Sequence, residues 1–468
     1  MSSGLFKTLR RSILALAFLA TASTLISDEA KEAVKFKAGD RVCFIGDSIT
    51  HGGGFNYHTQ VVLFYATRFP EMRFDSWNCG LSGDSASGTV RRYAWDIAPL
   101  KPTVSSIMLG MNDVWRDNYG KDKTGPEFEA KHKQAIDIYV DNMGKLSDTL
   151  LKDGSALIFI TPSIYDQTGT QKTNNLYGVN DALKICGDEA AKLAAKHNAG
   201  VADFHSLMTR INAEVQAKNP DDTIVGGDRV HPGAPGHLLM AYVFLKAQGM
   251  TPTVSSIAID ASKNAVLTQD NCKVSNLAAK SDSVSFEALE NALPFPIDDS
   301  AKKALDLAPV LKDLDQETLS VSGLAEGSYD LLIDGNAVGR YNASELKEGV
   351  NLATVKETPQ YKQAKKVMDL LKTRADIFSS KLRTFTAIRH FTLSKLTDRS
   401  PEAEQKCLEE QLEKSRKSNF GYGVWQIETY MKYVKDEESL KKEAADLLDK
   451  AYAENKPKSH SYELKKSL

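Results

Sequence analysis

Ser48 is the residue of this chain best placed to act as a nucleophile. It stands in Gly46-Asp47-Ser48-Ile49, directly after the apolar run 42–45, which predicts a buried strand. A parallel strand delivers its carboxyl end to the crevice where open α/β sheets bind ligands, and the glycine permits a sharp turn that leaves the hydroxyl accessible. Gly-Asp-Ser is also ordinary turn chemistry, so the assignment depends on the partners that follow.

Those partners are present downstream of Ser48. A serine hydroxyl needs a base, an orienting group and oxyanion donors before it can attack an ester. Asp228 and His231 supply a carboxylate and an imidazole three residues apart, which one loop can carry into the same crevice. Gly83 closes a glycine-rich loop after one predicted strand, and Asn112 follows another with a side-chain amide donor. These residue types indicate acyl transfer through a covalent intermediate.

Four sequence blocks, in this order, resemble the GDSL/SGNH hydrolase family, which comprises esterase- and lipase-like serine hydrolases. The family name records a Ser, a Gly, an Asn and a His. By this resemblance Ser48 corresponds to the nucleophile, and Asp228 and His231 to the remaining catalytic pair. The same resemblance makes Ser48 N–H, Gly83 and Asn112 the oxyanion hole.

The resemblance covers about residues 38–248, so roughly half of the chain has no family support. Ile49 stands where the family name has leucine, which alters no catalytic residue. Within this span, short apolar runs alternate with helical stretches and predict a parallel sheet with helices on both faces. That is the three-layer α/β/α sandwich, SGNH- or flavodoxin-like, which the resemblance also implies. The predicted strands are 42–45, 72–78, 103–109, 156–160 and 201–203.

Other residues compete for these roles and are weaker candidates. Ser85 lies in a second Gly-Asp-Ser, but it follows a loop rather than a strand, so we expect a turn or helix cap. His51 and His58 compete with His231 as the base, and neither has a carboxylate at short spacing on the expected loop. Further residues are expected to have structural roles by default: Asp84, Asp113, His197, His205 and His237.

Trp115 and Tyr119 follow Asn112 closely and are candidates for the substrate pocket, with simple packing of the loop an equal alternative. A long helix is predicted at 127–151, and the region 165–180 is expected to frame the edge of the crevice.

Composition predicts a soluble globular protein with more than one domain. The 468 residues are 42% hydrophobic and 26% charged, and the formal net charge of -2 gives no sign of nucleic-acid binding. The sequence contains no GxxxxGK phosphate loop and no clustered Cys/His spacing typical of zinc. We therefore expect no cofactor and no metal.

The first residues fit an export signal. Lys7, Arg10 and Arg11 precede an apolar segment at 12–19 and small residues that predict cleavage after Ala22. An uncleaved anchor is the alternative, but the apolar stretch is shorter than the ~20 residues that span a bilayer. A signal peptide at 1–22 predicts a secreted or periplasmic protein without a stable membrane span, and a twin-arginine route is a weaker option.

Five cysteines occupy positions 43, 79, 186, 272 and 407, an odd number that precludes complete intramolecular pairing. A disulfide between Cys43 and Cys79 is one possibility, and buried thiols are the expected state.

The remainder of the chain changes character. Residues 251–357 predict a β-rich accessory region, with a hairpin centred on Asp334-Gly335. Residues 358–455 predict helices, and 456–468 a disordered tail. The helices are expected to clamp the catalytic domain, bind a partner or form one wall of the site; the sequence does not choose among these roles or reveal the oligomeric state.

Three functions from different classes follow from this pattern. The first is an exported esterase that removes O-acetyl groups from a glycan. The second is a lipid esterase, lysophospholipase or thioesterase with the same chemistry. The third is a non-catalytic glycan-binding protein with a relic site, and the complete set of site residues argues against it. An apolar groove beside Ser48 would favour lipids, whereas exposed aromatic and polar groups would favour sugars.

Overall fold

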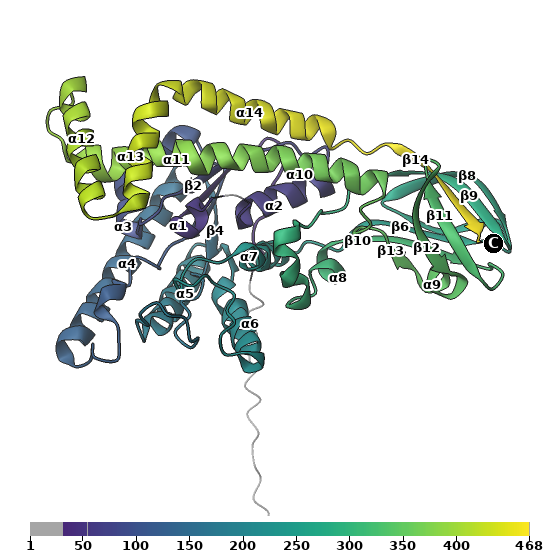
Figure 1. The fold of residues 1–468 in the computed structure, drawn as a ribbon, viewed down its shortest axis with the longest axis horizontal. Coiled ribbons are helices and arrows are strands. Elements are labelled where there is room, and N and C mark those ends of the chain that lie inside the picture. The colour runs from purple at the N-terminus through teal and green to yellow at the C-terminus, as the bar shows by residue number, and fades with distance from the viewer. Residues whose placement is uncertain (1–30, 54, 468) are drawn as a thin grey trace, which may run out of the picture.

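The computed structural model describes residues 31–53 and 55–467 (Figure 1). The predicted signal peptide at 1–22 lies outside these residues. The first part of the described chain, residues 31–250, contains a five-stranded parallel sheet of order β2-β1-β3-β4-β5 and is called the α/β domain below. Its strands are β1 (Arg41–Gly46), β2 (Asp75–Gly80), β3 (Val104–Met108), β4 (Ala156–Ile160) and β5 (Gly200–Ala202).

Helices cover both faces of this sheet, which confirms the predicted three-layer sandwich. Crossovers between parallel strands are right-handed. From β1 the chain moves first to β2 on one side and then back to β3, β4 and β5 on the other, so the β1–β2 crossover lies on one face of the sheet and the later crossovers lie on the other. The helix contacts agree, because α2 packs on α7, whereas α3, α4 and α5 form a separate contacting series. The helices are α1 (Ser48–His51), α2 (Tyr57–Arg68), α3 (Ala86–Arg92), α4 (Pro126–Lys152), α5 (Val179–Lys196), α6 (Phe204–Lys218) and α7 (Ala234–Ala247).

The strand order puts β1 and β3 on either side of a topological switch point. Ligands of open α/β sheets bind beyond the carboxyl ends of strands at such a point. Residues 42–45 of β1 are fully buried between the two helical layers, as a central parallel strand requires. The β1 carboxyl end is therefore a rigid platform for whatever follows it.

A second group of helices, residues 358–455, is called the helical region below. It comprises α10 (Pro359–Ile377), the π-helical turn Phe378–Leu382, α11 (Arg383–Ala387), the π-helical turn Ile388–Thr392, α12 (Pro401–Lys417), α13 (Gly421–Tyr433) and α14 (Glu437–Glu454). Figure 1 shows α10 and α14 running side by side, with α12 and α13 at one end and the β-sheets at the other. Because Leu371 of α10 and Leu448 of α14 belong to the main apolar core, this region is packed into the α/β domain.

The remaining strands form two sheets with a common apolar core. One sheet has the order β13-β10-β6-β7 and the other β12-β11-β14-β9-β8. Their strands are β6 (Thr253–Asp260), β7 (Ala265–Asp270), β8 (Cys272–Lys280), β9 (Ser283–Glu290), β10 (Gln316–Ser322), β11 (Ser328–Ile333), β12 (Asn336–Asn342), β13 (Val350–Asn351) and β14 (Ser459–Lys466). Short helices accompany them at α8 (Val310–Leu314) and α9 (Ala343–Glu348).

The expectation of a disordered tail at 456–468 is wrong for the residues of β14. This strand inserts between β9 and β11 and pairs antiparallel with both. Its side chains alternate, and Tyr462 and Leu464 are each only 1% exposed in the β-sheet core. The alternation of apolar and polar residues in a highly charged segment is the period-2 signal of a strand.

The described residues contain neither a disulfide bond nor a helix that could span a membrane. All five cysteines are free thiols, so Cys43 and Cys79 are not joined. Within residues 31–53 and 55–467, no helix combines the length and apolar character needed to cross a bilayer.

Candidate active site

Ser48 is presented at the first position of α1, directly beyond β1. The turn depends on Gly46, because a Cβ there would lie 2.2 Å from Thr50 Oγ1 and 2.9 Å from the Met108 carbonyl. Asp47 caps the helix by accepting the Ile49 N–H at 2.9 Å. Ser48 N–H lies in the first turn of a helix, where backbone N–H groups have no partner within the helix. This donor is therefore available beside the hydroxyl.

The structure brings the predicted carboxylate, base and nucleophile together. His231 Nε2 lies 2.7 Å from Ser48 Oγ, and His231 Nδ1 lies 2.5 Å from Asp228 Oδ2. Both distances are within hydrogen-bond reach, the geometry of a serine whose proton can pass to an imidazole. The carboxylate thus holds the ring with Nε2 directed at the serine.

Asp228 is held in its ionised form. Partial burial opposes ionisation, but hydrogen bonds from the His231 ring and from the N–H groups of His231 and Val230 outweigh it, so the pKa of Asp228 lies below its ordinary value. An ionised carboxylate at this position stabilises an imidazolium that forms when the serine proton is taken up.

Arg229 anchors the loop that carries this pair. It adopts a left-handed backbone conformation, with φ of 70°, and is 3% exposed. Its guanidinium donates to carbonyl oxygens of Asp166, Gly169, Gln171 and Thr173, all within 3.0 Å. The predicted crevice edge at 165–180 therefore holds the catalytic loop in place.

Sequence reasoning did not assign Arg229 a role. The available signal was that an arginine stands between Asp228 and His231 in the sequence. A guanidinium at such a position can donate to several carbonyl groups of a neighbouring loop without contacting the reacting atoms.

Gly83 and Asn112 lie in the same cavity as Ser48 and His231. Gly83 has φ of 81°, and its N–H has no hydrogen-bond acceptor within the part of the chain that the structure describes. Asn112 Nδ2 donates to the Asp84 carbonyl at 2.8 Å, while Arg116 donates to Asn112 Oδ1 at 3.2 Å. These bonds fix the orientation of the amide and leave its second N–H for a ligand.

His51 is occupied on both ring nitrogens and is not placed to act as a base. It is 3% exposed, Nδ1 accepts the Ser82 N–H at 3.1 Å, and Nε2 lies 2.9 Å from the Ser379 carbonyl. Because Nδ1 accepts a backbone N–H, Nε2 carries the proton. Burial lowers the pKa of His51 to about 4. His51 therefore supports the loop that contains Gly83.

The other competing side chains are structural. His58 is buried, its Nε2 lies 3.1 Å from the Thr50 carbonyl, and burial lowers its pKa to about 3. Ser85 caps α3 by accepting the Gly88 N–H at 3.2 Å, which confirms the expected helix cap. Asp113 accepts the Ala86 N–H at 2.8 Å, and burial raises its pKa to about 7.

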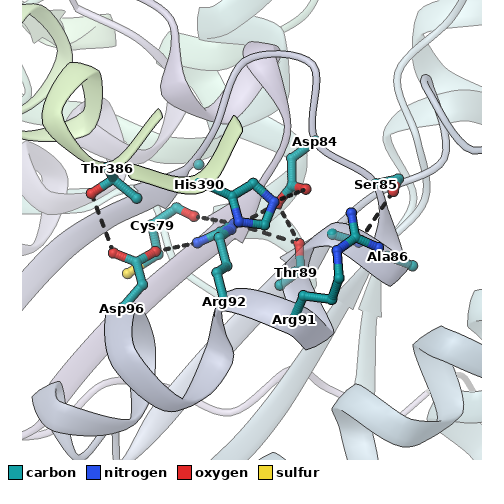
Figure 2. A network of polar contacts seen from close by, with 12 residues as sticks. Cys79, Asp84, Ser85, Ala86, Thr89, Arg91, Arg92, Asp96, Thr386 and His390 are labelled. Atoms are coloured by element: carbon teal, nitrogen blue, oxygen red, sulfur yellow. Dashed lines mark hydrogen bonds and ion pairs between the residues drawn. The ribbon is translucent and has the colours of Figure 1, made fainter. Parts of the chain in front are cut away.

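A buried ionic network is centred on Arg92 (Figure 2). Arg92 is fully buried and pairs with Asp84 at 2.7 Å and also with Asp96. His390 and Thr386, both from the helical region, face Asp84 and Asp96 respectively. Because the Asp84 carbonyl accepts from the Asn112 amide, this network connects the helical region to the candidate active site.

The active site opens into a cavity of about 1540 Å³ between the α/β domain and the helical region. Neither Trp115 nor Tyr119, the two candidates for the substrate pocket, is among the residues that line this cavity. Tyr119 is buried against His132 at a ring separation of 3.9 Å, and Trp115 starts a turn that directs the neighbouring Arg116 to the cavity instead.

The helical region supplies the aromatic wall that the α/β domain lacks. Phe391, Phe420, Tyr422 and Trp425 line the cavity, more than 300 residues after Ser48 in the chain. Sequence reasoning missed these residues. The available signal was the Phe-Gly-Tyr-Gly-Val-Trp run at 420–425, which is unusual in a region rich in Lys and Glu.

Comparison with known proteins defines the class to which this site belongs. Residues 44–239 match the model of the GDSL-like lipase/acylhydrolase family, and this range includes all the residues assembled around Ser48. The α/β domain is therefore similar to the GDSL-like lipase/acylhydrolase family of ester hydrolases, and this match does not extend to the helical and β-sheet regions.

Individual relatives cover different shares of the chain. An acetylxylan esterase of Geobacillus stearothermophilus is 28% identical over 236 residues, 46% of this chain and 97% of that protein. Its solved structure covers the same shares at 26% identity, with a TM-score of 0.39. A gut microbial diltiazem-metabolizing enzyme is 29% identical with a TM-score of 0.84, and the match covers 93% of this chain and 100% of that structure. The helical and β-sheet regions are thus part of an architecture shared with that enzyme.

Proposed function

We propose that this protein is an exported serine esterase that removes O-acetyl groups from carbohydrate through an acyl-enzyme. The observation that carries the proposal is the continuous hydrogen-bonded series from Asp228 through His231 to Ser48 Oγ, which opens into the large cavity. Such a series activates a hydroxyl that is inert at its free pKa.

In the first step, Ser48 Oγ attacks the carbonyl carbon of the ester, and its proton passes to His231 Nε2. The negative charge on the carbonyl oxygen is stabilised by Ser48 N–H, Gly83 N–H and the free N–H of Asn112. The bond to the alcohol then breaks, His231 returns the proton to the departing oxygen, and an acetyl group remains on Ser48.

In the second step, water attacks the acetyl-serine carbonyl while its proton passes to His231. The bond to Ser48 Oγ breaks, the serine regains the proton, and acetate leaves. Asp228 remains ionised throughout and offsets the positive charge on the imidazole.

The cavity composition supports a sugar as the alcohol. Exposed aromatic side chains occur there together with Gln411, Lys414 and Gln426, so ring faces and hydroxyl groups would both find partners. The name of the acetylxylan esterase relative agrees with an acetylated carbohydrate substrate.

A lipid or thioester substrate is the second candidate, and one observation favours it. Ile388, Phe391 and Leu396 form an apolar part of the cavity wall that could receive a longer acyl chain. Acyl-chain length therefore separates the two candidates.

Acetate release from acetylated xylo-oligosaccharides, compared with hydrolysis of 4-nitrophenyl esters of increasing chain length, tests the proposal. We expect acetyl transfer to dominate and Ser48→Ala and His231→Ala to abolish it, with Ser85→Ala as the matched control that retains activity. Full activity of Ser48→Ala would refute the mechanism, and a preference for long acyl chains would refute the acetylesterase assignment.

Export is a separate part of the proposal and rests on the sequence of residues 1–22. Amino-terminal sequencing of protein recovered from the periplasm or medium should find a start after Ala22. Full-length protein confined to the cytoplasm would contradict it.

A further inference from the structure

Three large aromatic side chains lie exposed at the start of α13. Phe420, Tyr422 and Trp425 are 53%, 43% and 41% exposed, and we call these three residues the α13 aromatic face. The Tyr422 and Trp425 rings are nearly parallel, with an interplanar angle of 26° and centroids 5.6 Å apart. Large apolar side chains that are grouped on a surface often mark a binding site, whereas scattered ones do not.

The α13 aromatic face lies in the same cavity as the reacting groups. Tyr422 Oη lies 3.2 Å from Ser82 Oγ, so one hydrogen bond joins the face to the residue preceding Gly83. Ser82 in turn is held by His51 at 2.9 Å. Because Gly83 is an oxyanion donor in the proposed function, a group lying on the aromatic face would border the ester carbonyl.

The size of the cavity indicates which part of the ester occupies this place. Ligand pockets commonly measure about 300–1,000 Å³, and this cavity is larger, at about 1540 Å³. An acetyl group needs only a small fraction of that space. The remaining volume, and the aromatic face with it, is therefore available to the alcohol portion.

The chemistry of the surrounding side chains favours a sugar alcohol. A pyranose ring presents a flat apolar C–H face that stacks on an aromatic ring, while its hydroxyl groups point outward around the rim. Gln411, Lys414 and Gln426 line the cavity together with the aromatic residues and supply donors and acceptors for such hydroxyl groups. A lipid chain would make no use of these donors and acceptors.

We propose that Tyr422 and Trp425 form a stacking subsite for a sugar ring of the acetylated substrate, supplied by the helical region to the active site of the α/β domain. The inference rests on the proposed function and names the part of the substrate that this surface binds. Trp425 is a binding residue, and Tyr422 both stacks and holds Ser82.

Two substrates separate binding of the alcohol from the chemical step. Acetylated xylotriose carries rings that can stack, whereas ethyl acetate carries none. We expect Trp425→Ala to lower kcat/KM for acetylated xylotriose about tenfold, which corresponds to about 1.4 kcal/mol, mainly through KM, because the ring on which the sugar stacks is lost. Activity on ethyl acetate should change less than about twofold, and Trp425→Phe should retain most of the sugar activity.

Tyr422 provides an internal comparison. Tyr422→Phe keeps the ring and removes the bond to Ser82, so it should affect kcat for both substrates alike, whereas Tyr422→Ala should also raise KM for acetylated xylotriose. Tyr177→Ala is the matched control, because Tyr177 is 48% exposed and does not line the cavity. It should leave both activities unchanged.

Direct binding separates this inference from the proposed function. When xylotriose is titrated into Ser48→Ala in a calorimeter, it should bind with measurable heat. Its affinity for Ser48→Ala/Trp425→Ala should be about tenfold lower. If xylotriose binds but the wild type does not hydrolyse acetylated xylotriose, the proposed function is refuted and the subsite is retained. Absence of xylotriose binding, or equal effects of Trp425→Ala on both esters, would overturn the subsite.

Discussion

Arg383 of α11 and Asp96 of the α/β domain form a two-point ion pair, with N–O distances of 2.8 and 2.9 Å. Both side chains are only 7% exposed. Burial of Asp96 opposes its ionisation, but Arg383 and Arg92 outweigh this effect and hold the pKa well below its ordinary value. Arg383 Nε also donates to the Gly80 carbonyl at 2.8 Å. The helical region is thereby fastened to the strand end that leads to the oxyanion loop.

Arg383→Ala should lower the free energy of unfolding by about 3–5 kcal/mol, because it removes one partner of a buried pair. The pKa of Asp96 is lowered on folding, so the stabilisation is present above the unfolded value of about 4 and declines as the pH falls through the depressed folded value. Urea unfolding at pH 7 and at pH 3 should therefore show a smaller difference between wild type and variant at the lower pH.

Arg340→Ala is the matched control for that measurement. Arg340 pairs with Asp330 on the exposed surface of the β region, and such pairs contribute little. An equal loss of stability in the two variants would contradict the role assigned to the buried pair.

Asn112→Ala should lower kcat about 10²–10³-fold with little change in KM, because an oxyanion donor acts mainly in the transition state. Steady-state kinetics on an acetyl ester measures this, with Asn142→Ala on α4 as the control. A change confined to KM would show that the Asn112 amide binds the ground state rather than the oxyanion.

Arg229→Lys should reduce kcat about 10²-fold, since lysine cannot reach four carbonyl groups and a displacement of about 1 Å in the catalytic loop has that cost. Arg210→Lys, on the exposed face of α6, tests for a general effect of the substitution. Unchanged kcat in Arg229→Lys would mean that Asp228 and His231 are positioned without the anchor.

Glu317→Gln should stabilise the protein at alkaline pH. Burial and the neighbouring Glu290 and Asp315 raise the pKa of Glu317 well above its ordinary value, and neither carboxylate oxygen has a hydrogen-bond partner among the described residues. The folded state thus favours the protonated acid, so wild-type stability falls as the pH rises above the unfolded pKa of about 4.3.

Thermal or urea unfolding of Glu317→Gln and wild type at pH 5 and pH 8 measures this effect. The variant should gain stability relative to the wild type between pH 5 and pH 8, by up to about 1.4 kcal/mol for each pH unit, because the amide cannot ionise and escapes the cost of keeping a buried carboxyl protonated. Glu287→Gln, on the exposed side of β9, should show no such pH dependence. A greater gain at pH 5 would contradict the raised pKa.

The sequence by itself determined the α/β domain and the residues brought to Ser48. An apolar run followed by Gly46 and a serine is a local pattern, and parallel strands must deliver their carboxyl ends to one edge of a sheet. For that reason Gly83 and Asn112, which follow predicted strands, could be expected near Ser48, and the resemblance to the GDSL/SGNH family implied that His231 joins them. The hairpin at Asp334-Gly335 was also predictable, because the residues that favour a tight turn act locally.

Only the tertiary structure decided what surrounds those residues. Trp115 is near Asn112 in sequence yet does not line the cavity, whereas Trp425 lies more than 300 residues away from Ser48 and does. The charged segment of β14 became a strand because β9 and β11 offered it two edges and a common core. Such outcomes depend on packing between distant segments, and the period of hydrophobic residues along the chain carries no information about which segments meet.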